Sequence, residues 1–306
     1  MIKYIKKVIK SFIRLEFDKL RRSSSQEMEN ILFQNGKLWA ALLPKDFPVP
    51  LQNTEFKVFS QWGDDGIIQY LINYLSIENK TFVEFGVEDY LESNTRFLLM
   101  NNNWSGLILD GSKSNIDKIK RSTIYWKYDL IAKHAFVTTE NINELIKDEG
   151  IEGEIGLLHI DIDGNDYWIW KALEVVDPII MIVEYNSIYG SKRAITIPYS
   201  EDFYRFKAHY SGLYAGASLK AMCKLAEKKD YNFIGCNSAG NNAYFVKKGY
   251  SKDLKILDPE TGYIESRFRE SRDANGHLNY KRAGDRIEVI KDLLIYNTDT
   301  NQMEKI

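Results

Sequence analysis

Three aspartates and an asparagine follow an apolar run in the stretch LLHIDIDGNDYW, residues 157–168. Carboxylates this close repel one another and raise each other's pKa unless a cation or hydrogen-bond donors lie between them. If the run is a buried strand, alternation places His159, Asp161 and Asp163 on one face. Asp161 and Asp163 then lie at the carboxyl end of the strand, where each could act as a general base or bind a ligand.

A second pair of oxygen ligands stands in VEYN, where Glu184 and Asn186 end another apolar run. Oxygen atoms from two neighbouring strand ends suit a hard cation such as Mg²⁺ or Mn²⁺. The predicted metal ligands are Asp161, Asp163, Glu184 and Asn186. Two alternatives stay open: the acids bind substrate hydroxyls directly, or DGND is a tight turn that caps the next helix. In either case we expect Asp163 and Asp166 to differ, one facing the substrate and one capping the helix.

Strands and helices alternate around these acids. The pattern predicts strands at 80–87, 104–111, 123–130, 155–163 and 177–186, with helices between them. Near-continuous apolar strands separated by helices indicate a parallel sheet that is covered on both faces. The last two predicted strands, 231–237 and 242–248, are joined by four residues and must be antiparallel. An α/β sheet that is mostly parallel with an antiparallel final hairpin is the strand inventory of the Rossmann-like class I methyltransferase fold.

Ligands of such sheets bind beyond the carboxyl ends of the strands. The first strand ends in Glu84 and Gly86, without the GxGxxG of dinucleotide-binding proteins, which disfavours a nicotinamide-dependent oxidoreductase. Gly86 would let the backbone approach a ligand, and the Glu84 carboxylate suits a cationic one. Asp110, at the end of the second strand, could bind both hydroxyls of a ribose. Asp129, at the end of the third, could accept a hydrogen bond from adenine. Each aspartate could instead be a helix cap.

Six segments carry a family resemblance: SQWGDDGII, FVEFGVEDYLESNTRFLL, WSGLILDGS, LLHIDIDGNDYWIWKAL, IVEYNS and GCNSAGNNAYFV. In order and spacing they resemble a branch of the FkbM-type S-adenosylmethionine-dependent methyltransferases that is found among bacterial surface-polysaccharide genes. The resemblance covers roughly residues 55–275. It implies S-adenosylmethionine as cofactor, with Glu84 and Gly86 in the first binding motif, Asp110 at the ribose and Asp129 near the adenine. The turn after the first strand departs from the family, because it holds one glycine.

The resemblance implies O-methylation of a sugar hydroxyl, on a nucleotide sugar or a surface glycan. Such a hydroxyl is a weak acid, so a base is needed, and Asp161 or Asp163 is expected to supply it. His209 is a reserve base, and His159 is expected to be a buried core histidine. Asn237 and Asn242 could bind sugar hydroxyls or serve only as turn residues. A metal would act as Lewis acid and template.

Basic residues outside this set leave the acceptor open. Lys192 and Arg193 stand in a Tyr-, Ser- and Gly-rich segment, 187–217, that would suit a phosphate- or carboxylate-bearing sugar. Arg267, Arg269 and Arg272 could clamp an anion or form surface ion pairs. The rival to an enzyme is a non-catalytic glycan-binding or scaffold protein of the same fold, which the single-glycine turn favours.

Composition narrows the remaining classes. The chain has 306 residues, of which 44% are hydrophobic and 27% charged, and a net charge of −2, which argues against a general nucleic-acid binder. Two cysteines, Cys223 and Cys236, without a CxxC indicate a reducing, cytoplasmic compartment. Residues 1–22 predict a basic amphipathic helix that contacts the inner face of a membrane peripherally, or docks on the protein itself or on a second copy in a homodimer. We expect no signal peptide. The predicted divisions are 1–50 (helix and linker), 51–250 (methyltransferase domain) and 251–306 (charged C-terminal extension).

Overall fold

The computed structural model describes residues 26–45 and 48–306, so the amphipathic helix and membrane contact predicted for residues 1–22 lie outside the described residues. Two compact units divide at Leu42 rather than at residue 50. In the first unit, residues 26–42 are helical. Several large apolar side chains of this helix are exposed: Met28, Ile31, Leu32, Leu38, Trp39 and Leu42. In the part of the chain that the structure describes, no helix combines the length and apolarity that a bilayer crossing requires.

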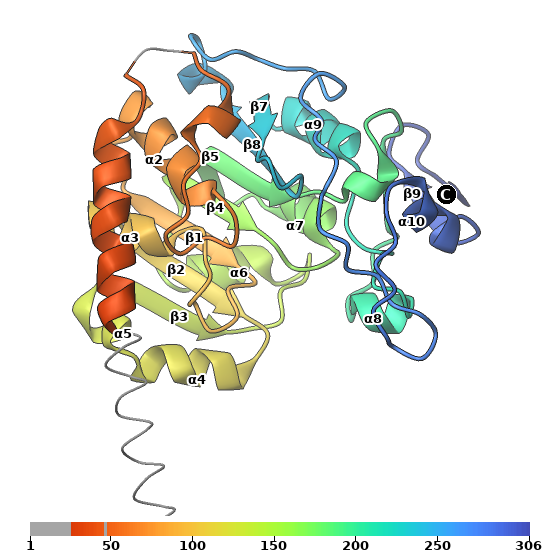
Figure 1. Cartoon of the computed structure of the whole chain (residues 1–306), viewed down its shortest axis with the longest axis horizontal. Coiled ribbons are helices and arrows are strands. Elements are labelled where there is room, and N and C mark those ends of the chain that lie inside the picture. Colours follow the sequence, from red (N-terminus) through yellow and green to blue (C-terminus); the bar gives the residue numbers. More distant parts are fainter. Residues whose placement is uncertain (1–25, 46–47) are drawn as a thin grey trace, which may run out of the picture. The chain divides into compact units, whose positions relative to one another are not determined.

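The second unit, Leu43–Ile306, is built on a seven-stranded sheet with the order β3-β2-β1-β4-β5-β8-β7 (Figure 1). Strands β1 to β5 are parallel, and β8 runs antiparallel to β5 and β7. Their bounds are β1 Thr81–Phe85, β2 Ser105–Asp110, β3 Leu130–His134, β4 Gly153–Ile160, β5 Val176–Glu184, β7 Tyr231–Cys236 and β8 Asn242–Lys247. This order, with its antiparallel end, is the predicted class I methyltransferase fold.

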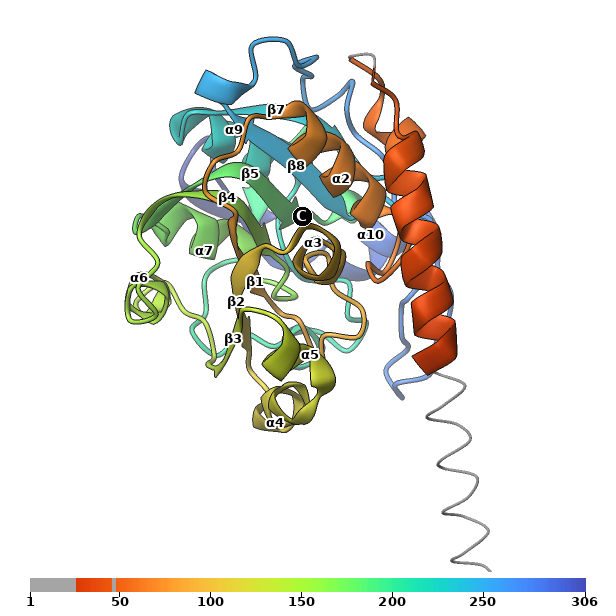
Figure 2. The same ribbon diagram turned by 90° about the vertical axis from the view of Figure 1, so that its left-hand side faces the viewer.

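Helices cover both faces of the sheet, as Figure 2 shows along the sheet edge. One face packs against α6 Ile142–Lys147, α7 Asp166–Ala172 and α9 Leu219–Lys228. The other packs against α2 Asp64–Tyr74, α3 Arg96–Asn102, α4 Lys113–Arg121 and α5 Thr123–Lys127. Alternate residues of each central strand enter the two cores: Leu158 and Ile160 face the first, and Leu157 faces the second. This is why these strands read as unbroken apolar runs in the sequence.

A second, three-stranded sheet has the order β10-β9-β6. It consists of β6 Ile195–Thr196, β9 Leu294–Asn297 and β10 Gln302–Lys305, with α10 Gly284–Ile290 beside it. The short helix α8 Arg205–Ala208 lies in the segment between β6 and α9. Ile195, Ile197 and Leu213 share a small core with Ile290 and Ile295. The residues predicted as a charged C-terminal extension, 251–306, therefore include strands and a helix that pair and pack with the segment after β5.

The third strand was predicted at 123–130, and the structure corrects this. Residues 123–127 form α5, which the Tyr128 N–H ends by donating to the Ile124 carbonyl, and β3 begins only at Leu130. At this sheet edge only alternate residues are buried, Leu130 and Ala132, so the strand lacks the continuous apolar run of its neighbours. Asp129 consequently precedes the strand, and its carbonyl accepts the Gly106 N–H near the start of β2. The predicted adenine contact of Asp129 is wrong, because Asp129 lies at the amino ends of the parallel strands, whereas the ligand was expected at their carboxyl ends.

The backbone of Gly86, just after β1, packs closely against the backbone of Asp161, just after β4. The φ of Gly86 is +74°, and a Cβ there would lie 1.7 Å from the Asp161 carbonyl oxygen. Its N–H donates to the Leu109 carbonyl of β2. The glycine was predicted to make room for a ligand, but the space that its missing side chain leaves is taken by the protein's own backbone.

We predict that Gly86→Ala lowers the free energy of unfolding by about 4 kcal/mol or more, since both φ strain and a backbone clash must be relieved. Gly150→Ala is the matched control, with the same φ of +74° and nothing within 4 Å of the added Cβ. We expect it to cost only about 1–2 kcal/mol. Chemical denaturation measures both variants, and equal losses would contradict the close packing at Gly86.

Candidate functional site

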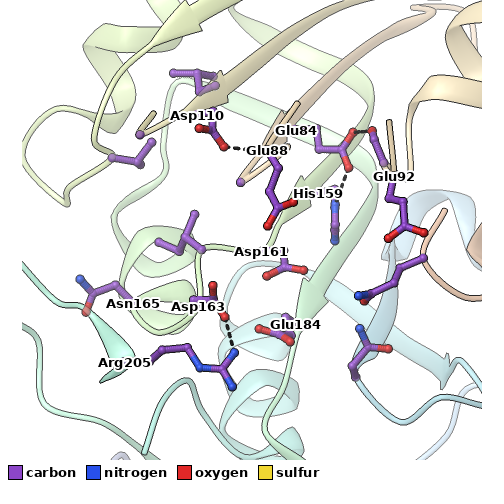
Figure 3. A pocket seen from close by; sticks show the side chains of 18 of the residues that line it. Glu84, Glu88, Glu92, Asp110, His159, Asp161, Asp163, Asn165, Glu184 and Arg205 are labelled. Carbon is purple, nitrogen blue, oxygen red and sulfur yellow. Dashed lines mark hydrogen bonds and ion pairs between the residues drawn. The ribbon is translucent and has the colours of Figure 1, made fainter. Parts of the chain in front are cut away.

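A cavity of about 770 Å³ lies at the carboxyl edge of the large sheet (Figure 3). It spans the point where the strand order reverses, between β1 and β4, which is where open α/β sheets bind ligands. The loops after β1 to β4, the end of β5 and the start of β8 line it, together with residues 61–62 and 203–206 and with Phe268 and Glu270. Eight carboxylate residues are among the lining residues: Glu84, Glu88, Glu92, Asp110, Asp161, Asp163, Glu184 and Glu270.

Strand register places the deepest polar pair. Glu84 of β1 lies beside His159 of β4, and His159 Nδ1 donates to Glu84 Oε1 at 3.0 Å. Both side chains are buried. Burial lowers the pKa of His159, but the hydrogen bond and charge of Glu84 raise it above its usual value. Burial likewise raises the pKa of Glu84, but His159 and neighbouring hydroxyls hold it below its usual value. The pair is a charge-assisted hydrogen bond in the core, as expected for a core histidine.

Glu84 also holds the loop that follows β1. Its carboxylate accepts from Ser93 Oγ at 2.5 Å, from Asn94 N at 3.0 Å, and from the N–H and hydroxyl of Thr95. Asn94 Nδ2 lies 3.2 Å from His159 Nε2, which closes the network. Glu84 lines the cavity, but its carboxylate is satisfied by protein groups. It therefore fixes the cavity wall whether or not it also contacts a cationic ligand.

Asp110 ends β2 at the cavity, as predicted. Its Oδ2 accepts from Glu88 N at 2.8 Å, and its Oδ1 accepts from Ser112 N at 2.7 Å and from Asn115 Nδ2 at 3.3 Å. Oδ2 can accept a further bond, and a second hydroxyl could replace the long Asn115 bond at Oδ1, so the residue fits a pair of ribose hydroxyls. Phe136, just beyond β3, lines the same part of the cavity and is half exposed. Its ring provides an apolar face at the position where Asp129 was expected.

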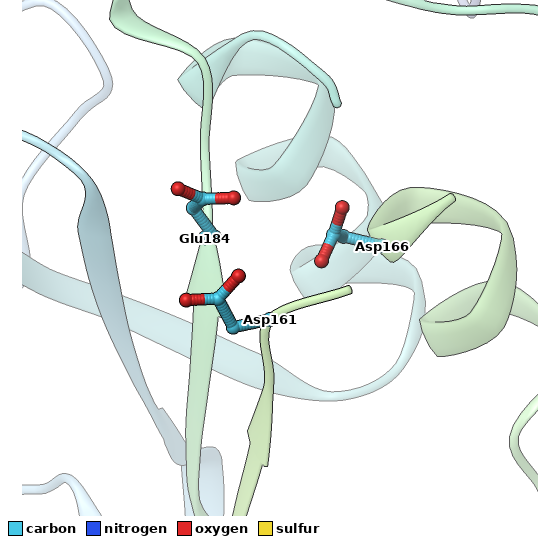
Figure 4. Close-up of side chains that lie close together, drawn as sticks. All are labelled: Asp161, Asp166 and Glu184. Carbon is cyan, nitrogen blue, oxygen red and sulfur yellow. The ribbon is translucent and has the colours of Figure 1, made fainter. Parts of the chain in front are cut away.

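Three carboxylates meet at the ends of β4 and β5 (Figure 4). One oxygen each of Asp161, Asp166 and Glu184 lies within 4.8 Å of the others. Ile160 pairs with Val183, so the next residues along the two parallel strands, Asp161 and Glu184, are brought together by register. Asp166, at the start of α7, accepts from the N–H groups of Ile162 and Gly164 at 2.9 Å each. We call Asp161, Asp166 and Glu184 the carboxylate cluster.

The carboxylate cluster holds protons more tightly than ordinary carboxylates do. Burial raises the pKa of Asp161 to about 6, an effect that His159 opposes and Asp163 reinforces. Burial and the charge of Asp161 raise the pKa of Asp166 to about 7. Burial and the charges of Asp161, Asp163 and Asp166 raise the pKa of Glu184 well above its usual value. The cluster is therefore a group of acids that are partly protonated near neutral pH and that a cation would ionise.

Two predicted metal ligands are placed elsewhere. Asp163 has φ +58°, which ends the strand alternation, and its side chain is largely exposed and pairs with Arg205 Nη1 at 2.6 Å. Asn186 accepts from Ile188 N, and its amide donates to the carbonyls of Leu213 and Ala215. The prediction that Asp163 and Asn186 join Asp161 and Glu184 is wrong. The sequence left open which of Asp163 and Asp166 caps the helix; the structure places Asp166 beside Asp161 and Glu184, where it also accepts from the N–H groups of the turn before α7.

The predicted reserve base and one predicted substrate ligand are not among the residues that line the cavity. His209 Nδ1 lies 2.7 Å from Ser211 Oγ, and burial lowers the pKa of the imidazole. Asn237 is fully buried, donates to Asp64 and accepts from the N–H groups of 240–242, so it is a turn residue. Asn242 does line the cavity. Its Nδ2 donates to Asp64 Oδ1 at 3.0 Å, and its buried Oδ1 accepts no bond from the described residues.

Sequence reasoning did not place Asp166 beside Asp161 and Glu184, and it missed Phe136, Arg205 and the pair Trp62 and Phe268. Asp166 carried a signal, because it is the third aspartate of the opening stretch, but the turn that folds it back is not visible in the pattern. Trp62 and Phe268 stack at 6.1 Å with an interplanar angle of 18°, and both line the cavity. They are distant in sequence, so no local pattern joins them.

Comparison with protein-family models and with curated proteins finds no match. The fold is similar to that of solved methyltransferase structures. One is an S-adenosylmethionine-dependent methyltransferase from Clostridium acetobutylicum ATCC 824, with 11% identity, 60% of this chain and 90% of that chain covered, and a TM-score of 0.38. Another is the O-methyltransferase from Bacillus cereus in complex with SAH, with 14% identity, coverages of 72% and 91%, and a TM-score of 0.37.

A third is the N-terminal domain of EvdMO1 with SAH bound, with 11% identity, coverages of 71% and 94%, and a TM-score of 0.40. Similarities this distant carry no argument about the chemistry of this chain. The fold assignment therefore stands on the strand order and register of the sheet itself.

We predict that the carboxylate cluster makes stability fall as pH rises. Its pKa values are raised in the folded state, so the folded protein binds more protons than the unfolded chain between about pH 4 and 7, and stability is lost through that window. Glu184→Gln removes one charge and should stabilise the metal-free protein at pH 8 by about 1–3 kcal/mol, with little effect at pH 4.5.

Chemical denaturation at the two pH values, with EDTA present, measures this difference. The exposed Glu201 provides the control, because Glu201→Gln makes the same change in charge away from the cavity. An equal effect of Glu184→Gln at both pH values would contradict the raised pKa values of the cluster.

Proposed function

We propose that this protein is an S-adenosylmethionine-dependent O-methyltransferase that acts on a sugar hydroxyl. The observation that supports this best is the division of the acidic cavity into two halves. Asp110 and Phe136 lie at the ends of β2 and β3, and the carboxylate cluster lies at the ends of β4 and β5. The first half suits a nucleoside cofactor, and the second suits activation of a hydroxyl.

The residues of the cofactor half fit S-adenosylmethionine by charge and shape. The cofactor carries a sulfonium, an ammonium and one carboxylate, so its net charge is positive and an acidic cavity favours it. Asp110 would accept hydrogen bonds from the two ribose hydroxyls, and Phe136 would pack against the adenine ring. When bound, the cofactor supplies an already activated methyl group, so the protein must align the acceptor and remove its proton.

Asp161 is the residue that we propose as the base. A carboxylate with a pKa near 6 is ionised at pH 7–8 and is a stronger base than an ordinary aspartate. Asp161 would take the proton of the acceptor hydroxyl, which leaves an oxygen lone pair free to receive the methyl group that a bound cofactor would supply. His159 and Glu84, one pleat deeper on the neighbouring strands, hold the wall behind Asp161.

The carboxylate cluster could also hold a divalent cation. Three carboxylate oxygens within 4.8 Å of one another are a donor set that suits Mg²⁺ or Mn²⁺. A bound cation would supply Lewis acidity to the acceptor hydroxyl. Direct binding of the hydroxyl by the carboxylates is the alternative, and both use Asp161 and Glu184.

The sugar acceptor rests on the family resemblance and on the shape of the cavity. Stacked Trp62 and Phe268 give an apolar aromatic wall of the kind that packs against the C–H face of a sugar ring. Carboxylate and amide side chains line the same cavity, and Asn242 offers an unused acceptor to a hydroxyl.

A non-catalytic glycan-binding protein of the same fold is the second candidate. Two observations favour it: the side-chain space at Gly86 is filled by the Asp161 backbone, and Glu84 is already satisfied within the protein. Calorimetry with S-adenosylhomocysteine separates the two, because a glycan-binding protein would retain glycan affinity without binding the cofactor product.

We predict that Asp110→Ala weakens S-adenosylhomocysteine binding by about 10- to 100-fold, since charge-assisted bonds to the ribose are lost. Asp129→Ala is the matched control, because Asp129 lies at the opposite edge of the sheet, and its affinity should equal that of the wild type. Calorimetry gives both constants, and melting temperatures check that each variant is folded. Equal losses in both variants would contradict the placement of the cofactor.

We predict that Asp161→Asn lowers methyl transfer by about 100-fold or more, the usual contribution of a general base, while S-adenosylhomocysteine still binds. In the wild type the rate should fall as the pH drops below about 6 and Asp161 becomes protonated. Transfer of a labelled methyl group to a sugar acceptor measures both effects.

The same assay decides the role of a metal. If the cluster holds a cation, EDTA abolishes transfer and Mn²⁺ restores it in the wild type. If the carboxylates act directly, EDTA has no effect and Asp161→Asn is still impaired. An Asp161→Asn variant with unchanged activity would contradict both forms of the proposal.

A further inference from the structure

We propose that the sugar unit which enters the cavity carries no phosphate or carboxylate group, and that a sugar with a protonated amine is preferred. This inference rests on the proposed function and names the acceptor class of that same site. The sequence left open two acceptors, a nucleotide sugar and a surface glycan. The proposal bears on this choice, because a nucleotide sugar could bind only with its phosphates outside the cavity.

The first support is the charge of the cavity lining. His159 balances Glu84, and Asp161 and Glu184 belong to the carboxylate cluster. The other carboxylate residues of the lining are Glu88, Glu92, Asp110, Asp163 and Glu270, and Arg205 is the one lysine or arginine among the described residues that line the cavity. Like charges brought together in a partly desolvated site repel strongly, and such repulsion is a common means of rejecting ligands. Glu88 projects into the cavity from the loop after β1 and adds negative charge between the two halves (Figure 3).

The second support is that Arg205 is already engaged. Its guanidinium donates to Asp163 Oδ1 at 2.6 Å and to the Gly212 carbonyl at 3.2 Å, and it lies 3.5 Å from Glu270 Oε2. It also lies over the ring of Phe206, with 5.2 Å to the centroid. An arginine held by two carboxylates is not available as an anion clamp.

The sequence offered Arg267, Arg269 and Arg272 as an anion clamp, but these arginines do not offset the negative charge of the cavity. Arg272 pairs with Glu270 and donates to the Gly276 carbonyl, and Arg269 lies over the ring of Tyr280. Arg267 is exposed, and it is not among the cavity-lining residues. These contacts match the surface ion-pair alternative better than the clamp.

An amine fits the same surroundings. Asp163 and Glu270 lie on either side of Arg205, and they show that this wall stabilises a cation. An ammonium group on the acceptor would gain from the same surplus of negative charge. The sugar ring itself would pack on the aromatic wall of Trp62 and Phe268, which is indifferent to charge.

The test compares four monosaccharides that differ mainly in charge: glucosamine, glucose, glucuronic acid and glucose 1-phosphate. Dissociation constants are measured by NMR titration on the full chain, with and without S-adenosylhomocysteine, and with EDTA present to remove bridging metal. We expect glucosamine to bind tightest, glucose next, and the two anions at least tenfold more weakly than glucosamine. Binding of glucose 1-phosphate or glucuronic acid as tight as that of glucosamine would overturn the proposal.

A variant that releases Arg205 tests the cause. Asp163→Asn combined with Glu270→Gln should improve glucose 1-phosphate binding at least tenfold and weaken glucosamine binding. Adding Arg205→Gln to this variant should abolish the gain. Glu201→Gln with Glu260→Gln is the control of equal net charge, since both residues are exposed and outside the cavity lining. A gain of the same size in the control, or one that survives Arg205→Gln, would overturn the role of Arg205.

Failure of this proposal is distinguishable from failure of the proposed function. If the wild type does not bind S-adenosylhomocysteine, the methyltransferase proposal is contradicted. The order of sugar affinities can still be measured on the free protein, so it tests the acceptor class independently. Cofactor binding combined with a preference for anionic sugars would overturn the acceptor class alone.

Discussion

The register of the parallel strands β1, β4 and β5 is the constraint on which the whole site depends. It pairs Glu84 with His159 in the core and, one step of alternation further, carries the strands to Gly86, Asp161 and Glu184 at the cavity. A slip of one residue would turn these side chains to the opposite face and leave charged groups among apolar ones. The apolar residues below them, Leu157 and Ile180, fix the register because they must face the core.

Buried carboxylates at two successive positions along these strands are stabilised differently: Glu84 lies deeper in the core, and Asp161 and Glu184 lie at the cavity. At the deeper level the charge of Glu84 is balanced by His159 and by hydrogen bonds from the loop after β1. At the cavity level no cationic side chain of the described residues forms an ion pair with Asp161 or Glu184, and burial raises their pKa values. Unbalanced carboxylates lower stability at neutral pH, and sites of this kind are typically functional. The paired Glu84 and His159 therefore form a fixed wall behind the unpaired carboxylates Asp161 and Glu184, which are the groups that could react.

Much of the fold could be predicted because it depends on patterns that are local in sequence. Apolar runs and their spacing gave the parallel sheet, its antiparallel end and the strand ends at Glu84, Asp110 and Glu184. The third strand was misplaced because it is an edge strand of the sheet, in which only alternate residues are buried and no continuous apolar run marks it. Asp129 was assigned to the wrong edge for the same reason.

The site was predicted less completely, because its details depend on turns and on distant segments. The positive φ of Asp163 turns its side chain out of the cluster, and the return of the chain at α7 brings Asp166 in. Neither follows from residue type. Residues 203–206, Phe268 and Glu270 reach the cavity from segments that are distant in sequence from the strand ends, which sequence spacing does not reveal.

The central claim is that one cavity holds a methyl donor at the ends of β1 to β3 and an acceptor hydroxyl at the ends of β4 and β5. A crystal structure of the full chain with S-adenosylhomocysteine tests it most directly. The ribose hydroxyls should lie within hydrogen-bond distance of Asp110, the adenine against Phe136, and the sulfur should face Asp161. A product bound away from Asp110, or with its sulfur turned away from the carboxylate cluster, would contradict the claim.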